Sequence, residues 1–196
     1  MTVPFNQRMY WDNLAGRPHY YQETYNMFFQ RADGGRFELR GQADGRVVGA
    51  PPLNRESVRS AVEDRIAENA IPDANVRSDE RGVTISLENI QFQPDSAVLM
   101  PSERDKLGSI GEILLEYPER DLLITGHTAL AGTAEGRQRL SEDRAASVGE
   151  YLIESNVRNR DQIVYQGLGA REPVASNDTP EGRRRNRRVE ITILEN

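Results

Sequence analysis

The chain has 196 residues, of which 37% are hydrophobic and 29% are charged, and its formal net charge is −6. This composition is typical of a soluble globular protein, and the negative charge argues against a general nucleic-acid-binding function. No apolar run approaches the ~20 residues that a membrane-spanning helix needs. The N-terminus shows no secretion signal, which predicts either a cytosolic protein or a trimmed mature fragment. The absence of cysteine excludes a disulfide framework, a thiol nucleophile and a lipid-modified cysteine.

Residues 1–52 are predicted to form a small β-rich segment. Turn signals at 33–35 and 44–45 separate runs that predict strands at about 20–30, 36–40 and 46–48. Three such strands would form an antiparallel meander, which is marginally stable alone and should pack on something else. The segment is therefore a candidate fragment of a larger N-terminal domain.

This segment also holds most of the aromatic residues of the chain. We expect them to form the buried face of the meander, although a platform for stacking sugars or binding other envelope proteins is an alternative. The nine aromatic residues are Phe5, Tyr10, Trp11, Tyr20, Tyr21, Tyr25, Phe28, Phe29 and Phe37.

A second domain is predicted to begin at residue 53, directly after two prolines. Asn54 is a suitable N-cap for a helix over 55–69, where apolar residues recur at helical spacing and Pro72 follows. A turn at 79–82 precedes a strand in which Val83, Ile85 and Leu87 alternate. After this strand the alternation of apolar residues shifts by one position, which predicts a bulge or bend at 88–89.

The next predicted helix lies over about 102–117. Ser102 and Asp105 resemble a capping box at its start. Leu107, Ile110 and Leu114 mark its buried stripe, and Pro118 closes it.

The stretch 122–152 is the most informative part of the sequence. An apolar strand at 122–124 runs into a polar turn, and Thr133 can cap the helix that follows. In that helix Arg144 shares one stripe with Leu140, Val148 and Leu152. A guanidinium on an otherwise apolar stripe needs an anion, which predicts a site for a carboxylate. The alternative is that Arg144 pairs with an internal acid or reaches water.

The rest of the chain completes an alternation of helices and strands. A strand is predicted at 163–166, a loop at 172–181, and a closing strand in which Val189, Ile191 and Ile193 alternate. The arginine-rich run 183–188 reads as loop anchors followed by a solvated strand face. The order of the elements predicts an α+β fold in which helices pack on a mixed sheet.

Five motifs in sequence resemble those of the OmpA-like peptidoglycan-binding domain, over residues 87–194. The resemblance implies a βαβαβ(β) mixed sheet with helices packed on it, with 53–82 as a lead-in helix and turn and 83–196 as the core. The motifs are IQFQPDSAVL at 90–99, ITGHT at 124–128, LSEDRA at 140–145, GLG at 167–169, and the C-terminal signature from Pro173 to Glu190, which contains NRRVE.

The resemblance implies a noncatalytic module that binds the peptide stem of peptidoglycan through its diaminopimelate residue. Matching the family motifs assigns the carboxylate-binding arginine to Arg144. It also assigns ligand contacts to Asp95, Thr128 and Arg187. The planar fork of arginine suits a carboxylate, which agrees with the anion site inferred from the stripe.

Two positions depart from the family pattern. Ala129 stands where the family has an aspartate that faces the ligand ammonium, and Arg137 stands where it usually has asparagine. The pocket has therefore lost an anion and gained a cation, so diaminopimelate recognition should be weakened or altered. Three outcomes are open: Asp95, Glu135 or Asp143 replaces the lost carboxylate, the pocket accepts a different diamino acid or carboxylate, or the domain is a structural or protein-interaction module that no longer binds.

Catalysis is not predicted, because no nucleophile-elbow motif or metal-ligand cluster accompanies His127. We expect no metal and no cofactor. The expected partner is peptidoglycan, with no nucleic acid and no membrane span. The expected location is the periplasm, with outer-membrane association through a part outside this sequence.

Overall fold

The computed structural model describes residues 5–12, 17–30, 35–46, 52–93 and 96–195. Contacts between Cα atoms divide the chain into two compact units, Met1–Pro52 and Leu53–Asn196. Each unit is described by itself.

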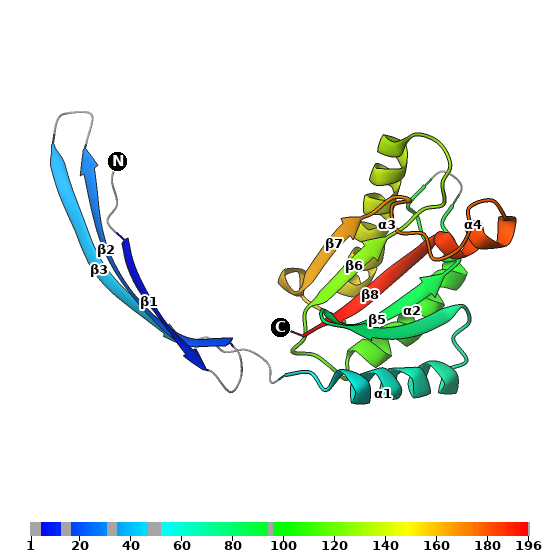
Figure 1. Ribbon diagram of the computed structural model, residues 1–196, viewed down its shortest axis with the longest axis horizontal. Coiled ribbons are helices and arrows are strands. Elements are labelled where there is room, and N and C mark those ends of the chain that lie inside the picture. Colours follow the sequence, from blue (N-terminus) through cyan, green and yellow to red (C-terminus); the bar gives the residue numbers. More distant parts are fainter. Residues whose placement is uncertain (1–4, 13–16, 31–34, 47–51, 94–95, 196) are drawn as a thin grey trace. The chain divides into compact units, whose positions relative to one another are not determined.

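The first unit is a three-stranded antiparallel sheet with the order β1-β2-β3 (Figure 1). Its strands are β1 (Phe5–Asp12), β2 (Arg17–Gln30) and β3 (Arg36–Arg46). The meander was predicted, but β1 was missed and the turn expected at 44–45 is wrong. Asp44 and Gly45 lie within β3, where they pair with Gln22 and Tyr21.

The aromatic residues of this unit do not all face a buried surface. The side chain of Phe28 is 54% exposed, which contradicts the prediction for that residue. Tyr25 is half-buried because its ring covers its cross-strand partner Gly41, whose missing side chain leaves the space. The remaining side chains lie outside the part that the structure describes, and they belong to Phe5, Tyr10, Trp11, Tyr20, Tyr21, Phe29 and Phe37.

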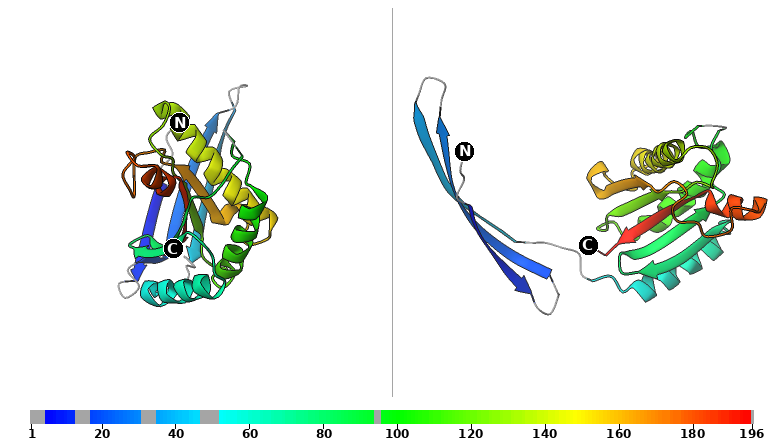
Figure 2. Two further views of the ribbon diagram at one scale, coloured as in Figure 1. Left: turned by 90° about the vertical axis from the view of Figure 1, so that its right-hand side faces the viewer. Right: turned by 45° about the horizontal axis from the view of Figure 1, so that its top comes forward.

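The second unit is a two-layer α+β fold, which confirms the predicted fold class. Five strands form a mixed sheet in the order β4-β5-β8-β6-β7, in which only the β6–β7 pair is parallel among the described strands. The helices α1, α2 and α3 cover one face of this sheet (Figure 2). The elements are α1 (Arg55–Glu68), β4 (Ala74–Asp79), β5 (Gly82–Glu88), α2 (Pro101–Leu114), β6 (Leu122–Gly126), α3 (Ala134–Glu154), a 3₁₀ turn (Arg160–Gln162), β7 (Ile163–Gly167), α4 (Pro180–Asn186) and β8 (Arg188–Leu194).

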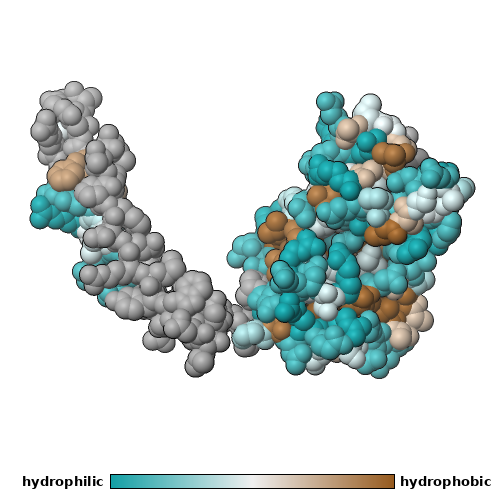
Figure 3. Space-filling model, in the orientation of Figure 1, coloured by the Kyte–Doolittle hydropathy of each residue, from teal (hydrophilic) through white to brown (hydrophobic). Residues whose placement is uncertain are grey.

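The core lies between the sheet and the three helices. Alternate residues of the central strands point into it, and fully buried residues of α2 and α3 meet them. On the outside, apolar side chains show as separate patches among hydrophilic ones on the face seen in Figure 3. Among the described residues, no helix combines the length and apolar character needed to cross a membrane.

Helix starts follow the predicted caps in two of three cases. The Asn54 side chain accepts a hydrogen bond from Ser57 N at 3.1 Å, and Thr133 Oγ1 accepts from Gly136 N at 3.1 Å. The predicted cap at Ser102 is wrong. The helix α2 begins at Pro101 with Met100 as N-cap, because proline suits the first helical position and needs no capped N–H there.

In the second unit, the 3₁₀ turn and the elements β4 and α4 were not predicted. The edge strand β4 is polar and alternates between exposed and half-buried positions, so it carries no apolar run. The short helix α4 lies partly in the predicted loop and continues through the arginine run. Arg184 and Arg185 act as the expected anchors, because they pair with Asp73 and Glu88 at 3.3 and 3.0 Å.

The bend expected after β5 is confirmed. The strand ends at Glu88, and Asn89 adopts a φ of 56°, in the left-handed region that asparagine tolerates better than most residues. This break sends the chain across the end of the sheet toward the candidate site.

Candidate ligand-binding site

The candidate site is built on the turn that joins β6 to α3. Gly126 ends the strand against the backbone of α3, where a Cβ would overlap the Ser141 carbonyl. The turn is then held on both sides by the backbone. His127 N donates to Arg188 O at 3.0 Å, and Thr128 N donates to Gly169 O at 2.8 Å. The turn is therefore fixed between the end of β7 and the start of β8.

Arg144 lies on α3 three residues after Ser141, whose carbonyl packs against Gly126 of the turn. Its stripe neighbours Val148 and Leu152 are fully buried, whereas Arg144 itself is half-buried. The guanidinium carbon lies 4.8 Å from the centroid of the Phe92 ring. Phe92 is positioned by a β-bridge to Leu99 that closes the segment after β5. This cation–π contact orients the planar group, as a carboxylate receptor requires.

The hydroxyl of Thr128 is buried without a hydrogen-bond partner among the described residues. Thr128 is only 6% exposed, and its Oγ1 makes no hydrogen bond to any residue that the structure describes. A buried hydroxyl in this state costs about 1–3 kcal/mol. Such an atom is therefore suited to bind a ligand that enters the turn.

Two residues depart from the family pattern. Ala129 lies in the turn between β6 and α3, and Arg137 lies in the first helical turn of α3. Ala129 is buried and contributes only a methyl group. The Arg137 side chain folds back on the turn, where its Nη1 donates to Gly132 O at 2.6 Å. One donor of the Arg137 guanidinium is therefore already hydrogen-bonded to the chain itself.

The other predicted ligand contacts are Arg187 and Asp95. Arg187 is exposed, and its carbonyl accepts from Asn89 N at 3.0 Å, next to the Arg188 carbonyl that holds His127. Asp95 lies outside the described residues. Glu135 and Asp143, the other candidates for a replacement carboxylate, are exposed on α3.

Two asparagines tie the turn to the C-terminal helix. Asn177 Oδ1 accepts from Leu130 N at 2.9 Å and from Asn186 Nδ2 at 3.0 Å. The Asn186 side chain also accepts from Val174 N and Ala175 N. Sequence reasoning placed these residues in a motif without giving them a role, and the structure assigns them to holding the turn.

A buried charge network lies behind the turn. Glu190 accepts from Arg188 Nε at 2.8 Å and from Arg77 Nη2 at 2.5 Å, and His127 Nε2 lies 3.8 Å away. Burial acts to raise the pKa of the Glu190 carboxyl, but contacts with His127 and Arg188 lower it well below its usual range. The solvated face expected for Arg188, Glu190 and Thr192 is therefore wrong. Their polar groups pair with one another and with Thr84, which allows them to be buried.

Comparisons with known proteins agree with this architecture. Residues 91–187 match the OmpA family model. The chain is 36% identical over 135 residues to "Probable lipoprotein YiaD" of Escherichia coli, covering 63% of this chain and 61% of that protein. It is 39% identical over 104 residues to "Peptidoglycan-binding protein ArfA" of Mycobacterium tuberculosis, covering 53% of this chain and 32% of that protein.

The same fold occurs in solved structures. The cell wall anchor of the T6SS from Pseudomonas aeruginosa superposes with a TM-score of 0.61 at 26% identity, over 70% of this chain and 99% of that one. The chain spans 32% to 61% of the length of the two curated relatives named above. Residues 91–187 of this chain form an OmpA family domain.

Proposed function

We propose that the OmpA family domain is a noncatalytic module that binds the stem peptide of peptidoglycan and so tethers an envelope protein to the cell wall. The observation that carries the proposal is the Arg144 guanidinium held over the Phe92 ring, together with a buried Thr128 hydroxyl that has no hydrogen-bond partner among the described residues. An arginine fork and a hydroxyl together provide donors for a carboxylate. Relatives named as a peptidoglycan-binding protein and a cell wall anchor support the same reading.

The site is proposed to recognise diaminopimelate more weakly than its family does, or to prefer a different diamino acid. Ala129 provides no counter-charge for a ligand ammonium. A charged hydrogen bond is worth about 1.5–3 kcal/mol, so its loss lowers affinity by roughly one to two decades. The engagement of Arg137 by Gly132 O reduces the repulsion that its charge would otherwise add.

The proposed location is the periplasm, with outer-membrane association through a part outside this sequence. Similarity to a probable lipoprotein supports this proposal. The first unit, 1–52, is proposed to contact other envelope proteins, since Phe28 and Leu39 expose apolar surface on its strands.

Co-sedimentation with purified sacculi tests the proposal. The wild-type chain should sediment with the sacculi, and Arg144→Ala should remain largely in the supernatant. Arg139→Ala is the matched control, because Arg139 is an exposed arginine on the same helix and its loss changes the net charge equally. Equal retention of the three proteins would remove Arg144 from the binding site.

A second candidate function is a structural or protein-interaction domain whose pocket no longer binds. Ala129 favours this alternative, because the family's acidic contact is missing. In that case neither the wild-type chain nor its Ala129→Asp variant should sediment with sacculi. Sedimentation of the wild-type chain above the level of an unrelated acidic protein would exclude this candidate.

A further inference from the structure

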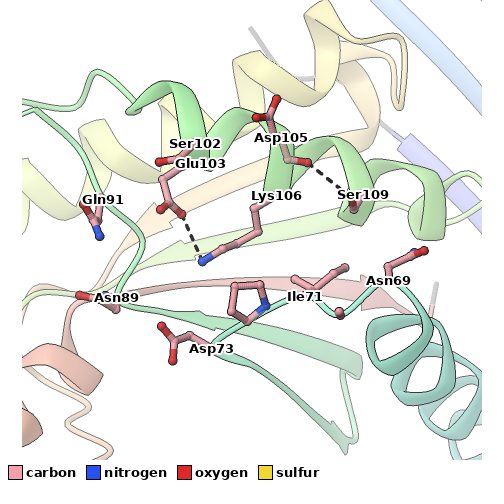
Figure 4. A pocket seen from close by; sticks show the side chains of 12 residues that line it. Asn69, Ile71, Asp73, Asn89, Gln91, Ser102, Glu103, Asp105, Lys106 and Ser109 are labelled. Atoms are coloured by element: carbon pink, nitrogen blue, oxygen red, sulfur yellow. Dashed lines mark hydrogen bonds and ion pairs between the residues drawn. The ribbon is translucent and has the colours of Figure 1, made fainter.

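A polar pocket of about 380 Å³ lies between α2 and the segment that joins α1 to β4 (Figure 4). Its walls come from the first turns of α2, from residues 69–73 and from Asn89 and Gln91. The volume falls within the range of small-molecule sites. Gln91 lies in this pocket, while the next residue, Phe92, contacts Arg144, so the two sites flank one short segment.

An ion pair that is almost fully buried projects into this pocket. Lys106 Nζ lies 3.2 Å from Glu103 Oε2, and the two side chains are only 9% and 7% exposed. In Figure 4 both extend from α2 toward the segment that carries Asp73. No described residue gives Glu103 Oε2 a hydrogen bond of good geometry. A buried pair of this kind contributes little to stability, because desolvation offsets its attraction.

Lys106 is also the only lysine in the sequence. The chain has 25 basic residues of the lysine and arginine type, and all the others are arginine. Elsewhere the chain uses arginine for its surface ion pairs, including the Arg59 and Arg65 pairs of α1. Lysine differs from arginine in presenting a compact charge with three rotatable donors on a flexible stem. Such a group can exchange one anionic partner for another within a small pocket.

We propose that this pocket binds a zwitterionic α-amino acid group, with the ligand carboxylate on Lys106 and the ligand ammonium on Glu103. A ligand that carries both charges on one carbon matches two opposite charges 3.2 Å apart. Each protein charge then exchanges its partner and none is left alone. A simple cation would leave Lys106 unpaired and a simple anion would leave Glu103 unpaired, and both states are costly in a buried site.

The surrounding groups keep this charge balance. Asp73 also lines the pocket, but Arg184 Nη1 lies 3.3 Å from its carboxylate. Asp105 also lines the pocket, but in Figure 4 its carboxylate points away from Lys106 and Glu103. The amides of Asn89 and Gln91 supply neutral donors and acceptors. The ligand source is a free amino acid or the exposed end of a diamino acid in a stem peptide, and the inference does not depend on the turn site.

Three linear probes of similar length separate the ligand classes: meso-diaminopimelate, pimelate and cadaverine. Lysine-selective ¹³C labelling of the full chain gives one side-chain NMR signal, from Lys106, and backbone amides of Asn89 and Ser102 report beside it. Diaminopimelate should shift these signals saturably, whereas the dicarboxylate and the diamine should not. A stem peptide ending in diaminopimelate, compared with free alanine, identifies the source.

Variants test the assignment of the two charges. Glu103→Gln and Lys106→Met should each weaken diaminopimelate binding at least tenfold, and Glu112→Gln, at an exposed glutamate of the same helix outside the pocket, should not change it. The shifts should persist in Arg144→Ala, which separates this pocket from the turn site. Unchanged affinity in Glu103→Gln, with an amide spectrum that shows an intact fold, would overturn the proposal, as would equal shifts with the three probes.

Discussion

The direction of the Arg144 side chain is set by two neighbours in the fold. Helical spacing places it in line with buried Val148 and Leu152, and the Phe92 ring stacks on its guanidinium. A cation–π contact is worth about 0.5–2 kcal/mol. Because the side chain is held before a ligand arrives, less rotamer entropy is lost on binding.

Ala129→Asp should increase the affinity for diaminopimelate by about one to two decades, because it restores a charged hydrogen bond to the ligand ammonium. Isothermal titration calorimetry of both proteins measures the change. Ala129→Asn is the matched control, since it adds the same volume without the charge. An equal gain in both variants would show that shape, and not charge, limits binding at this position.

Glu190→Gln should destabilise the second unit by about 3 kcal/mol, because it removes one charge from a buried pair. The pKa of Glu190 is lowered in the folded state, so its stabilising contribution is complete above the unfolded pKa of about 4.3 and is lost as the pH falls below it. Urea unfolding between pH 7 and pH 3 should therefore show a smaller loss of stability in the variant. Parallel pH profiles would contradict this role.

At the scale of single elements, the C-terminal end of α2 is closed by Arg158. This buried arginine donates from Nε to Arg120 O at 2.9 Å and from Nη2 to Leu114 O at 2.8 Å, and it also reaches Tyr117 O. Leu114 O and Tyr117 O also accept the backbone N–H groups of Tyr117 and Arg120, so Arg158 is their second donor and supplies a donor to Arg120 O. Burial lowers the pKa of the Arg158 guanidinium, and the charges of Glu119 and Asp121 offset only part of this effect.

Arg158→Met should cost about 1–3 kcal/mol of unfolding free energy, because Arg120 O loses the Arg158 donor and the other two carbonyls lose their second donor. Arg160→Met is the control. Arg160 forms an exposed ion pair with Glu150 at 2.6 Å, which contributes at most about 1 kcal/mol. Urea unfolding of the two variants measures the difference, and similar losses would show that the end of α2 does not depend on Arg158.

The elements with regular signals could be predicted from the sequence, and those without them could not. Asn54 and Thr133 were identified as caps because a side-chain oxygen stands directly before an amphipathic run. The strand β4 was missed because an edge strand needs no apolar alternation. The helix α4 has only 7 residues, which is too few for a helical repeat of apolar residues to stand out in the sequence. Thr179 and Pro180 at its start are nevertheless a recognisable N-terminal signal.

The site itself was only partly accessible to sequence reasoning. The stripe spacing correctly placed Arg144 among buried residues of α3. Nothing local in the sequence could show that Phe92 stacks on it or that Arg137 folds back to Gly132, since both contacts depend on tertiary packing and rotamers. The solitary lysine was visible in the composition, but its burial beside Glu103 was not.

At the scale of the whole molecule, the hydrophobic core that the structure describes lies in the second unit. The cluster of buried apolar residues that the structure describes runs from Leu53 to Ile193, with none in the first unit. The three-stranded sheet of the first unit has no comparable cluster among its described residues. The division of the chain into independent domains stays a prediction that this distribution favours.

A fragment of residues 53–196 should therefore fold on its own and retain the unfolding free energy of the second unit. Circular dichroism and urea unfolding of the fragment and the full chain measure this, with sacculus binding as a functional control. A fragment that unfolds at markedly lower urea concentration would show that residues 1–52 are part of the same cooperative unit.

The most direct test of the binding account is an NMR titration of the full chain with a soluble stem peptide that contains a diamino acid. The account predicts saturable shifts centred on the amides of Thr128 and Gly136 and on the Arg144 side chain, which disappear in Arg144→Ala and remain in Arg139→Ala. An absence of saturable shifts at the turn in the wild-type chain, or shifts there that persist in Arg144→Ala, would contradict it.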